Sequence, residues 1–232
     1  MKLNNLHDVL VDNLRDLYNA EKQLIKALPK LAKTATAPDL RDAFQEHLAV
    51  TQEHAHRLEE IFNELEEKPG GKHCSAMEGL IEEGSEVIKE SKNSDADAID
   101  AALIVAAQKV EHYEMSGYGS ARTFAKHLGF SHIAELLQQT LDEESETDEK
   151  LSQLAESHIN SQAAHGGDRS NHDGDDSMED RDYDYEGVAV SRAGVGRSRS
   201  TSGSGRSASR SNGGSRSGSR SRSGSSRGRT RR

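Results

Sequence analysis

The feature that most constrains the fold is a spacing of apolar residues by alternating four and three positions, which persists through most of the first 160 residues. Its first run holds six leucines and one acid: Leu10, Leu14, Leu17, Glu21, Leu24, Leu28 and Leu31. Residues at these intervals lie on one face of an α-helix, because the helix turns once every 3.6 residues. The run therefore predicts an amphipathic helix, residues 5–34, whose buried face carries a carboxylate.

The same spacing predicts three more long helices, at about residues 38–67, 95–128 and 131–159. A shorter helical segment, residues 75–91, falls in the connection between the second and third of them. Few glycines and few β-branched runs interrupt these segments, which favours helices over strands. We therefore predict an all-α fold, a four-helix bundle with one long crossover that contains a short helix. This is the connectivity of ferritin-like bundles.

Local residue types predict where some of these helices begin and end. Ser94, with Asp97 three residues later, is expected to cap the third long helix, and Ser131 is expected to cap the fourth. Gly129 is expected to end the third helix, because glycine readily takes the left-handed conformation found after a helix.

Charge divides the chain near residue 160. Residues 1–160 hold 16 Lys and Arg against 31 Asp and Glu, whereas residues 161–232 hold 14 Arg, no Lys and 9 acids. The first part, residues 1–160, has the length and apolar content of one folded domain. The second part, residues 161–232, has too few apolar residues to offset the entropy of ordering, which predicts a disordered tail.

The predicted tail is acidic over residues 161–186 and basic over residues 187–232, where 12 Arg and no acid occur among Ser and Gly. Arginine-rich segments of this kind bind phosphates, so we expect weak, salt-sensitive binding to nucleic acid or another polyanion. The arginines expected to contribute include Arg197, Arg199, Arg220, Arg222, Arg229, Arg231 and Arg232. The alternatives are a soluble spacer and a segment that associates with acidic surfaces, including its own domain.

The sequence also predicts the compartment. Its first residues, "MKLNNLHDVLVDNL", lack the basic segment and apolar run of a secretion signal, and no stretch of about 18 apolar residues follows. Cys74 is the single cysteine, so no disulfide can form within the chain. We expect a soluble cytoplasmic protein without membrane contact.

Polar side chains interrupt the apolar stripe near the middle of every long helix. They are Glu21 on the first, Thr51 and His54 on the second, Glu111 or Glu114 on the third, and Glu144 and Asp148 on the fourth. Buried carboxylates repel one another and cost several kcal/mol unless protons, bases or cations compensate them. A divalent metal resolves this repulsion, and oxygen ligands with a histidine favour iron or manganese. The predicted ligands are Glu21, His54, Glu111, Glu114, Glu144 and Asp148.

The second long helix departs from the ligand pattern of ferritin-like bundles, in which a Glu precedes a His by three residues. The literal pair, Glu53 and His56, should face outward, whereas the inward pair is Thr51 and His54. His47, on the same stripe, is expected to be a hydrogen-bonded core residue.

Two alternatives to a metal-binding bundle are compatible with the same residues. In the first, His54, His112 and Tyr118 satisfy the carboxylates without metal, and the bundle is an interaction or protective protein. In the second, the bundle is a scaffold that brings the Arg-rich tail to DNA or RNA. The residues do not decide whether the activity is enzymatic.

Four blocks of sequence add a resemblance to these inferences: "LYNAEKQLIKALPKLA", "CSAMEGLIEEGSEVI", "AAQKVEHYEMSGYG" and "LLQQTLDEESETDEKLSQLA". Together they resemble the YciF-like family of ferritin-like bacterial stress proteins, over about residues 4–160. The resemblance implies a ferritin-like fold related to rubrerythrin, induction under osmotic or similar stress, and homodimers. It does not cover the tail.

The resemblance also implies roles for particular acids. Glu21 matches the acid of the first helix, Glu111 and Glu114 match the acids of "EHYE", and Glu144 with Asp148 matches those of the fourth helix. Val50 stands where the family often has an acid. The expected function is a stress-response protein that binds one or two metal ions between its helices, with an oxidase or peroxide-consuming activity.

Overall fold

The computed structural model describes residues 2–165, in which every regular element is helical. The elements are α1 (Leu6–Thr34), α2 (Pro38–Glu64), α3 (Ser75–Glu90), α4 (Ala96–Leu128) and α5 (Ser131–Leu154), then a π-helical turn η1 (Ala155–Ile159) and α6 (Asn160–Ala164). The predicted all-α class is confirmed. None of these helices is both long and apolar enough to cross a membrane.

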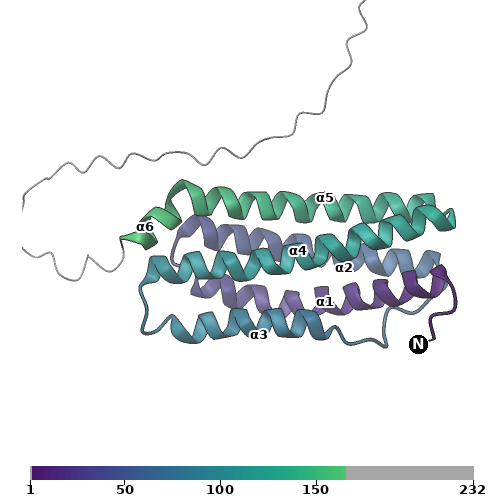
Figure 1. The fold of residues 1–232 in the computed structure, drawn as a ribbon, viewed down its shortest axis with the longest axis horizontal. Helices are drawn as coiled ribbons and strands as arrows, with labels where there is room; N and C mark the ends of the chain where they lie inside the picture. The colour runs from purple at the N-terminus through teal and green to yellow at the C-terminus, as the bar shows by residue number, and fades with distance from the viewer. Residues whose placement is uncertain (1, 166–232) are drawn as a thin grey trace, which may run out of the picture. The chain divides into compact units, whose positions relative to one another are not determined.

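Four long helices, α1, α2, α4 and α5, lie side by side in Figure 1. Short links, residues 35–37 and 129–130, join α1 to α2 and α4 to α5, so each of these pairs is antiparallel. The long connection between α2 and α4 contains α3, which packs against α1 and α4. This arrangement confirms the predicted four-helix bundle with one crossover.

Helix ends follow local chemistry, and two of the predicted caps were wrong. Gly129 ends α4 as predicted, with φ of 82°. At the start of α4, however, Asp95 rather than Ser94 accepts a hydrogen bond from the backbone N–H three residues on. The next helix begins at Ser131 itself and has no side-chain cap. Both serines lie one residue away from the position whose side chain can reach the free N–H groups.

The last helical segment extends beyond the predicted domain boundary. Helix α5 continues through η1 into α6, which ends at Ala164. Residues 161–164, which the composition assigns to the tail, are therefore helical. Ile159 explains the extension, because it is buried in the core and holds this segment on the bundle. Residues 166–232, with all seven arginines named above, lie outside the described residues.

The core consists of two apolar clusters, one toward each end of the bundle. Along α1, Leu10, Leu14 and Leu17 belong to one cluster, whereas Leu24 and Leu28 belong to the other. The other long helices divide in the same way. Glu21 lies between the two clusters on α1, so a polar layer crosses the bundle where the apolar stripes of its helices are interrupted.

Candidate metal centre

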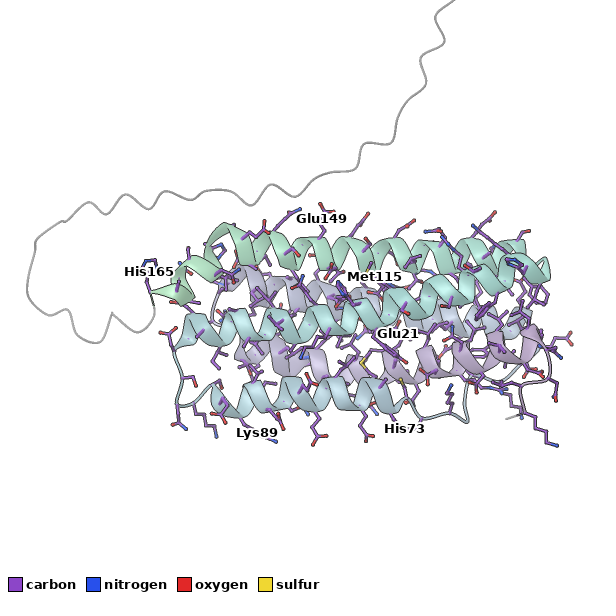
Figure 2. The ribbon with its side chains drawn as sticks, in the orientation of Figure 1. Glu21, His73, Lys89, Met115, Glu149 and His165 are labelled. Atoms are coloured by element: carbon purple, nitrogen blue, oxygen red, sulfur yellow. The ribbon has the colours of Figure 1, made fainter. Side chains whose placement is uncertain are left out.

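The polar layer is built from all four long helices, and its side chains are almost completely withdrawn from solvent. Figure 2 labels Glu21 in the interior of the bundle, whereas Glu149 lies on the outer side of α5. Six ionisable residues of the layer are at most 5% exposed: Glu21, His47, His54, Glu111, Glu114 and Glu144. Helix periodicity accounts for the layer, because each residue occupies a position that its helix turns toward the core.

One group of this layer is centred on His54. Its Nδ1 lies 3.0 Å from Glu144 Oε1 and 3.6 Å from Glu21 Oε1. The Tyr118 hydroxyl donates a hydrogen bond to Glu21 Oε1. On the other side of the imidazole ring, Nε2 lies 2.9 Å from Glu143 Oε2. The ring therefore has one nitrogen on a partly exposed carboxylate and the other toward the buried acids.

Glu143 is itself held in place. Arg57 Nη1 lies 2.7 Å from Glu143 Oε2, and Gln139 donates a hydrogen bond of 2.9 Å to Glu143 Oε1. The Arg57 guanidinium keeps the pKa of Glu143 below its usual range despite partial burial, which acts in the opposite direction. A carboxylate that accepts from one imidazole nitrogen fixes the ring orientation and leaves the other nitrogen free to bind a metal.

A second group comprises His47, Glu111, Glu114 and Glu144. One ligand atom from each of these residues lies within 4.8 Å of the others. His47 Nε2 is 3.2 Å from Glu111 Oε1, and His47 Nδ1 is 3.3 Å from the Thr147 hydroxyl. Glu144 belongs to this group and to the group of Glu21 and His54. The two groups therefore form one continuous set of nitrogen and oxygen ligands.

Many atoms of this set lack a hydrogen-bond partner. Within residues 2–165, nine buried side-chain nitrogen or oxygen atoms are unpaired. Eight of them belong to the layer: Glu21 Oε2, His47 Nε2, His54 Nδ1, Glu111 Oε2, and both carboxylate oxygens of Glu114 and Glu144. The two imidazole nitrogens lie close to carboxylates but are not aligned for a hydrogen bond with them.

Unpaired atoms of this kind point to a missing partner. Buried polar atoms are nearly always paired, because leaving one unpaired costs about 1–3 kcal/mol. A cation coordinated by these nitrogen and oxygen atoms would satisfy them together.

Burial also changes how these groups titrate. It raises the pKa of Glu21 and of Glu111 to about 8, and it raises the pKa of Glu114 and Glu144 as well. Burial alone would lower the pKa of His54, but Glu144 and Glu21 outweigh it and raise that pKa to about 9. In the absence of metal the layer therefore retains protons near pH 7, which a divalent cation would displace.

Comparison with known proteins agrees with the fold of this bundle. Residues 5–164 match the model of a family described as Domain of unknown function (DUF892). The chain belongs to the DUF892 family. It is 44% identical over 164 residues to protein YciF of Escherichia coli strain K12, and the match covers 70% of this chain and 98% of YciF. The predicted resemblance to the YciF-like family is thereby confirmed.

Solved structures of other proteins show the same architecture. The crystal structure of the E. coli stress protein YciF matches with a TM-score of 0.64 at 43% identity, covering 68% of this chain and 98% of that one. YcfI from Rhodopseudomonas palustris matches with a TM-score of 0.62 at 39% identity, covering 65% and 95%. A protein from Xanthomonas campestris, 17% identical with a TM-score of 0.53 and covering 72% and 99%, shares the fold alone.

The structure brings together five of the six residues predicted as ligands: Glu21, His54, Glu111, Glu114 and Glu144. Asp148 belongs to neither group, although its charge helps to raise the pKa of Glu111. The Asp148 carboxylate accepts a hydrogen bond of 3.1 Å from Gln108 and lies 3.3 Å from His112 Nε2. Of the three residues in the metal-free alternative, His112 is mostly exposed beside Asp148, whereas His54 and Tyr118 contact the buried acids.

The histidines and acids of α2 were also the subject of predictions. Glu53 and His56 are exposed, as the helix register predicted. His47 is a buried, hydrogen-bonded residue as expected, with Thr147 as its partner, and it also belongs to the second group. A signal for it exists in the sequence, because His47 lies seven residues before His54 and therefore two turns away on the same face. Glu143 has no comparable signal, because its role depends on how α5 packs against α2.

Proposed function

We propose that this DUF892 domain binds one or two divalent metal ions, iron or manganese, in the polar layer and is a stress-response protein with oxidase or peroxide-consuming activity. The observation that carries the proposal is the convergence of eight unpaired ligand atoms from four helices around Glu144. Carboxylate oxygens with two imidazole nitrogens form a ligand set typical of iron and manganese. Neither group contains a cysteine thiolate, the ligand type that favours zinc or copper.

Individual side chains would bind the metal or orient its ligands. Glu144 belongs to both groups, so it would bind a single central ion or be shared between two ions. Tyr118 orients Glu21 by its hydrogen bond, and Glu143 orients His54. A bound ion of this kind supplies redox or Lewis-acid chemistry. The two apolar clusters flank the site toward the two ends of the bundle.

The stress role rests on the relative. The E. coli protein is described as a stress protein, and it shares 43% of its aligned residues with this chain over nearly its whole length. Identity of this extent across the entire bundle supports a common biological role. Metal chemistry that consumes an oxidant would suit such a role.

Metal content per chain tests the proposal. The full chain, purified without chelator and reloaded anaerobically with iron or manganese, should retain about one or two equivalents by inductively coupled plasma mass spectrometry. Glu21→Ala and Glu144→Ala should lose this metal, whereas Glu53→Ala, an exposed acid on α2, should retain it. Less than about a tenth of an equivalent after reloading would refute the proposal and favour a metal-free interaction or protective protein.

The proposed activity needs a separate measurement. The loaded protein should consume hydrogen peroxide or dioxygen faster than an equal concentration of free metal, and Glu144→Ala should abolish the excess. A loaded protein that merely matches free metal would leave metal binding intact and overturn the enzymatic part.

A further inference from the structure

A pocket of about 150 Å³ lies between α2 and α5 beside the polar layer. Two of its lining residues, His47 and Glu111, belong to the second ligand group. Phe44, Val50 and Leu151 provide apolar walls. The proposed function does not use this pocket, but the pocket connects the buried ligands with the surface.

We infer that this pocket is the access site through which a divalent cation reaches the buried centre, with an acidic rim that attracts the ion and buried ligands that receive it. The inference rests on the proposed function, because it assigns a route to the same centre. It adds a second, transient binding site for the cation, formed by residues that are not the final ligands.

Two buried side chains of the second ligand group form the inner end of the pocket. His47 is 5% exposed and Glu111 is 1% exposed, yet both line the pocket. His47 Nε2 and Glu111 Oε2 are buried without a hydrogen-bond partner. Of the described ligand residues, His47 and Glu111 alone line this pocket, so an ion that enters it reaches these two residues first.

The rim has the charge that a cation requires. Glu46 from α2 and Glu143 and Glu146 from α5 line the pocket, with Lys150 as the one base among its lining residues. Lys150 donates a hydrogen bond to Glu46 and so links α5 to α2 across the mouth. Because Glu46 is ion-paired with Lys150 and Glu143 with Arg57, the excess negative charge at the mouth comes from Glu146. Negative charge there attracts cations and raises their rate of encounter.

A second cavity also reaches Glu111 but does not suit a cation. It lies between α1, α3 and α4, holds about 30 Å³, and is lined mainly by leucine, isoleucine and alanine. Glu111 is the one acid among its lining residues, and Lys30 adds a positive charge, so a hydrated divalent ion would lose its water there for few oxygen ligands, which is costly. The pocket between α2 and α5 is therefore the favoured route.

The rate of metal binding tests this route. Co²⁺ binding to the metal-free full chain can be followed by visible absorbance after rapid mixing at low ionic strength. Glu146→Lys should slow binding about fivefold and Lys150→Glu should accelerate it, while the final stoichiometry stays unchanged. Salt near 1 M should remove both differences, because it screens charges beyond about 3 Å.

A matched pair of surface charges provides the control. Glu83 on α3 and Lys109 on α4 form an ion pair away from this pocket, and both are about half exposed. Glu83→Lys and Lys109→Glu change the net charge of the chain by the same amounts and should leave the rate unchanged. In addition, Val50→Phe should slow binding at every salt concentration, because it narrows the pocket itself.

The outcomes separate the two claims. If the rim variants bind Co²⁺ at the rate of the unchanged protein, or if the control pair alters the rate equally, the access route is wrong while the metal centre stands. If the unchanged protein binds no Co²⁺ at all, both the centre and the route are refuted.

Discussion

Glu144 lies within reach of both groups of ligand atoms, and neither of its carboxylate oxygens makes a hydrogen bond within residues 2–165. Glu114 is in the same condition, with both oxygens unpaired and no exposure. Glu144 lies 3.0 Å from His54 Nδ1, whereas Glu114 has no such partner within residues 2–165. An uncompensated buried acid costs more than an apolar side chain of similar volume, so Glu114 destabilises a metal-free bundle. The proposed metal would compensate it.

Replacing Glu114 with leucine tests whether this acid lowers the stability of the metal-free protein and contributes to metal binding. In the presence of chelator, Glu114→Leu should raise the free energy of unfolding by about 1–3 kcal/mol in urea, because a buried acid is replaced by an apolar group. The same variant should bind less metal. Glu135→Leu, an exposed position on α5, should change the stability by less than about 0.5 kcal/mol. A destabilised Glu114→Leu protein would mean that this carboxyl is already compensated within the fold.

Glu143 provides a test of how His54 is oriented. Glu143→Gln should weaken metal binding by about 10- to 100-fold in a competitive chelator titration, because the amide is a weaker acceptor for the imidazole N–H. Glu149→Gln on the exposed side of α5 should have no effect. Equal affinities for both variants would show that Glu143 does not orient the histidine for metal binding.

How far the individual residues could be predicted depended on burial and on packing. Glu21 and Glu144 are flanked by leucines along their stripes, so periodicity alone placed them in the core. Asp148 lies on the predicted stripe of α5 but is partly exposed beside Gln108, because the face of a helix that becomes buried is set by its neighbours. The proximity of His47 to Glu111 could not be predicted for a similar reason, since only the packing of α4 brings Glu111 to it.

At the scale of elements, α1 and α4 approach each other closely at Gly117. A Cβ atom added there would lie 2.7 Å from Leu17 Cδ2, inside the distance that real contacts permit. Leu17 is itself 1% exposed in an apolar cluster, so it has little room to move. Gly117 also accepts a hydrogen bond of 3.0 Å from Asn13 through its carbonyl oxygen. The glycine therefore sets the separation of these helices next to the polar layer.

Two glycines two positions apart in α4 allow a paired test. Gly117→Ala should be less stable than Gly119→Ala by about 1–3 kcal/mol in urea unfolding, because overpacking opposes the gain in helix propensity only at residue 117. A Cβ at residue 119 would lie 3.9 Å from Leu141, an ordinary contact. Equal stabilities would show that α1 shifts freely and that its approach to α4 is not fixed by Gly117.

The helices themselves were largely predictable, because seven or more turns of consistent spacing leave little ambiguity in a segment such as α1. The ends of the helices were less predictable. Ser94 and Asp95 are both good caps, and only the position of the first helical residue decides between them. The extension into α6 was missed because polar composition outweighed one buried isoleucine, Ile159.

At the scale of the whole bundle, the polar layer divides the core and couples folding to protonation. The raised pKa values of Glu21 and Glu111, about 8 against 4.5 for an exposed glutamate, mean that the folded state holds more protons between these values. Stability then falls as the pH rises through this range. His54, with a pKa raised to about 9, acts in the same direction, whereas the lowered pKa of His47 acts oppositely below about 6.5.

The free energy of unfolding of the metal-free protein should therefore decrease between about pH 5 and pH 8, as measured by urea unfolding with chelator. With saturating manganese the trend should be weaker or reversed, because the metal binds the deprotonated groups and its contribution grows with pH. Glu111→Gln should flatten the metal-free curve. A metal-free protein whose stability rises steadily over this range would contradict the assigned protonation.

The most direct measurement is a crystal structure of the manganese- or iron-loaded protein with anomalous diffraction data collected at the absorption edge of the metal. We expect one or two anomalous peaks inside the bundle, each beside Glu144. The other ligands of each ion would be Glu21 and His54, or His47, Glu111 and Glu114. A loaded crystal whose anomalous peaks lie only on surface acids, with the layer closed by hydrogen bonds among its own side chains, would contradict the proposed metal centre.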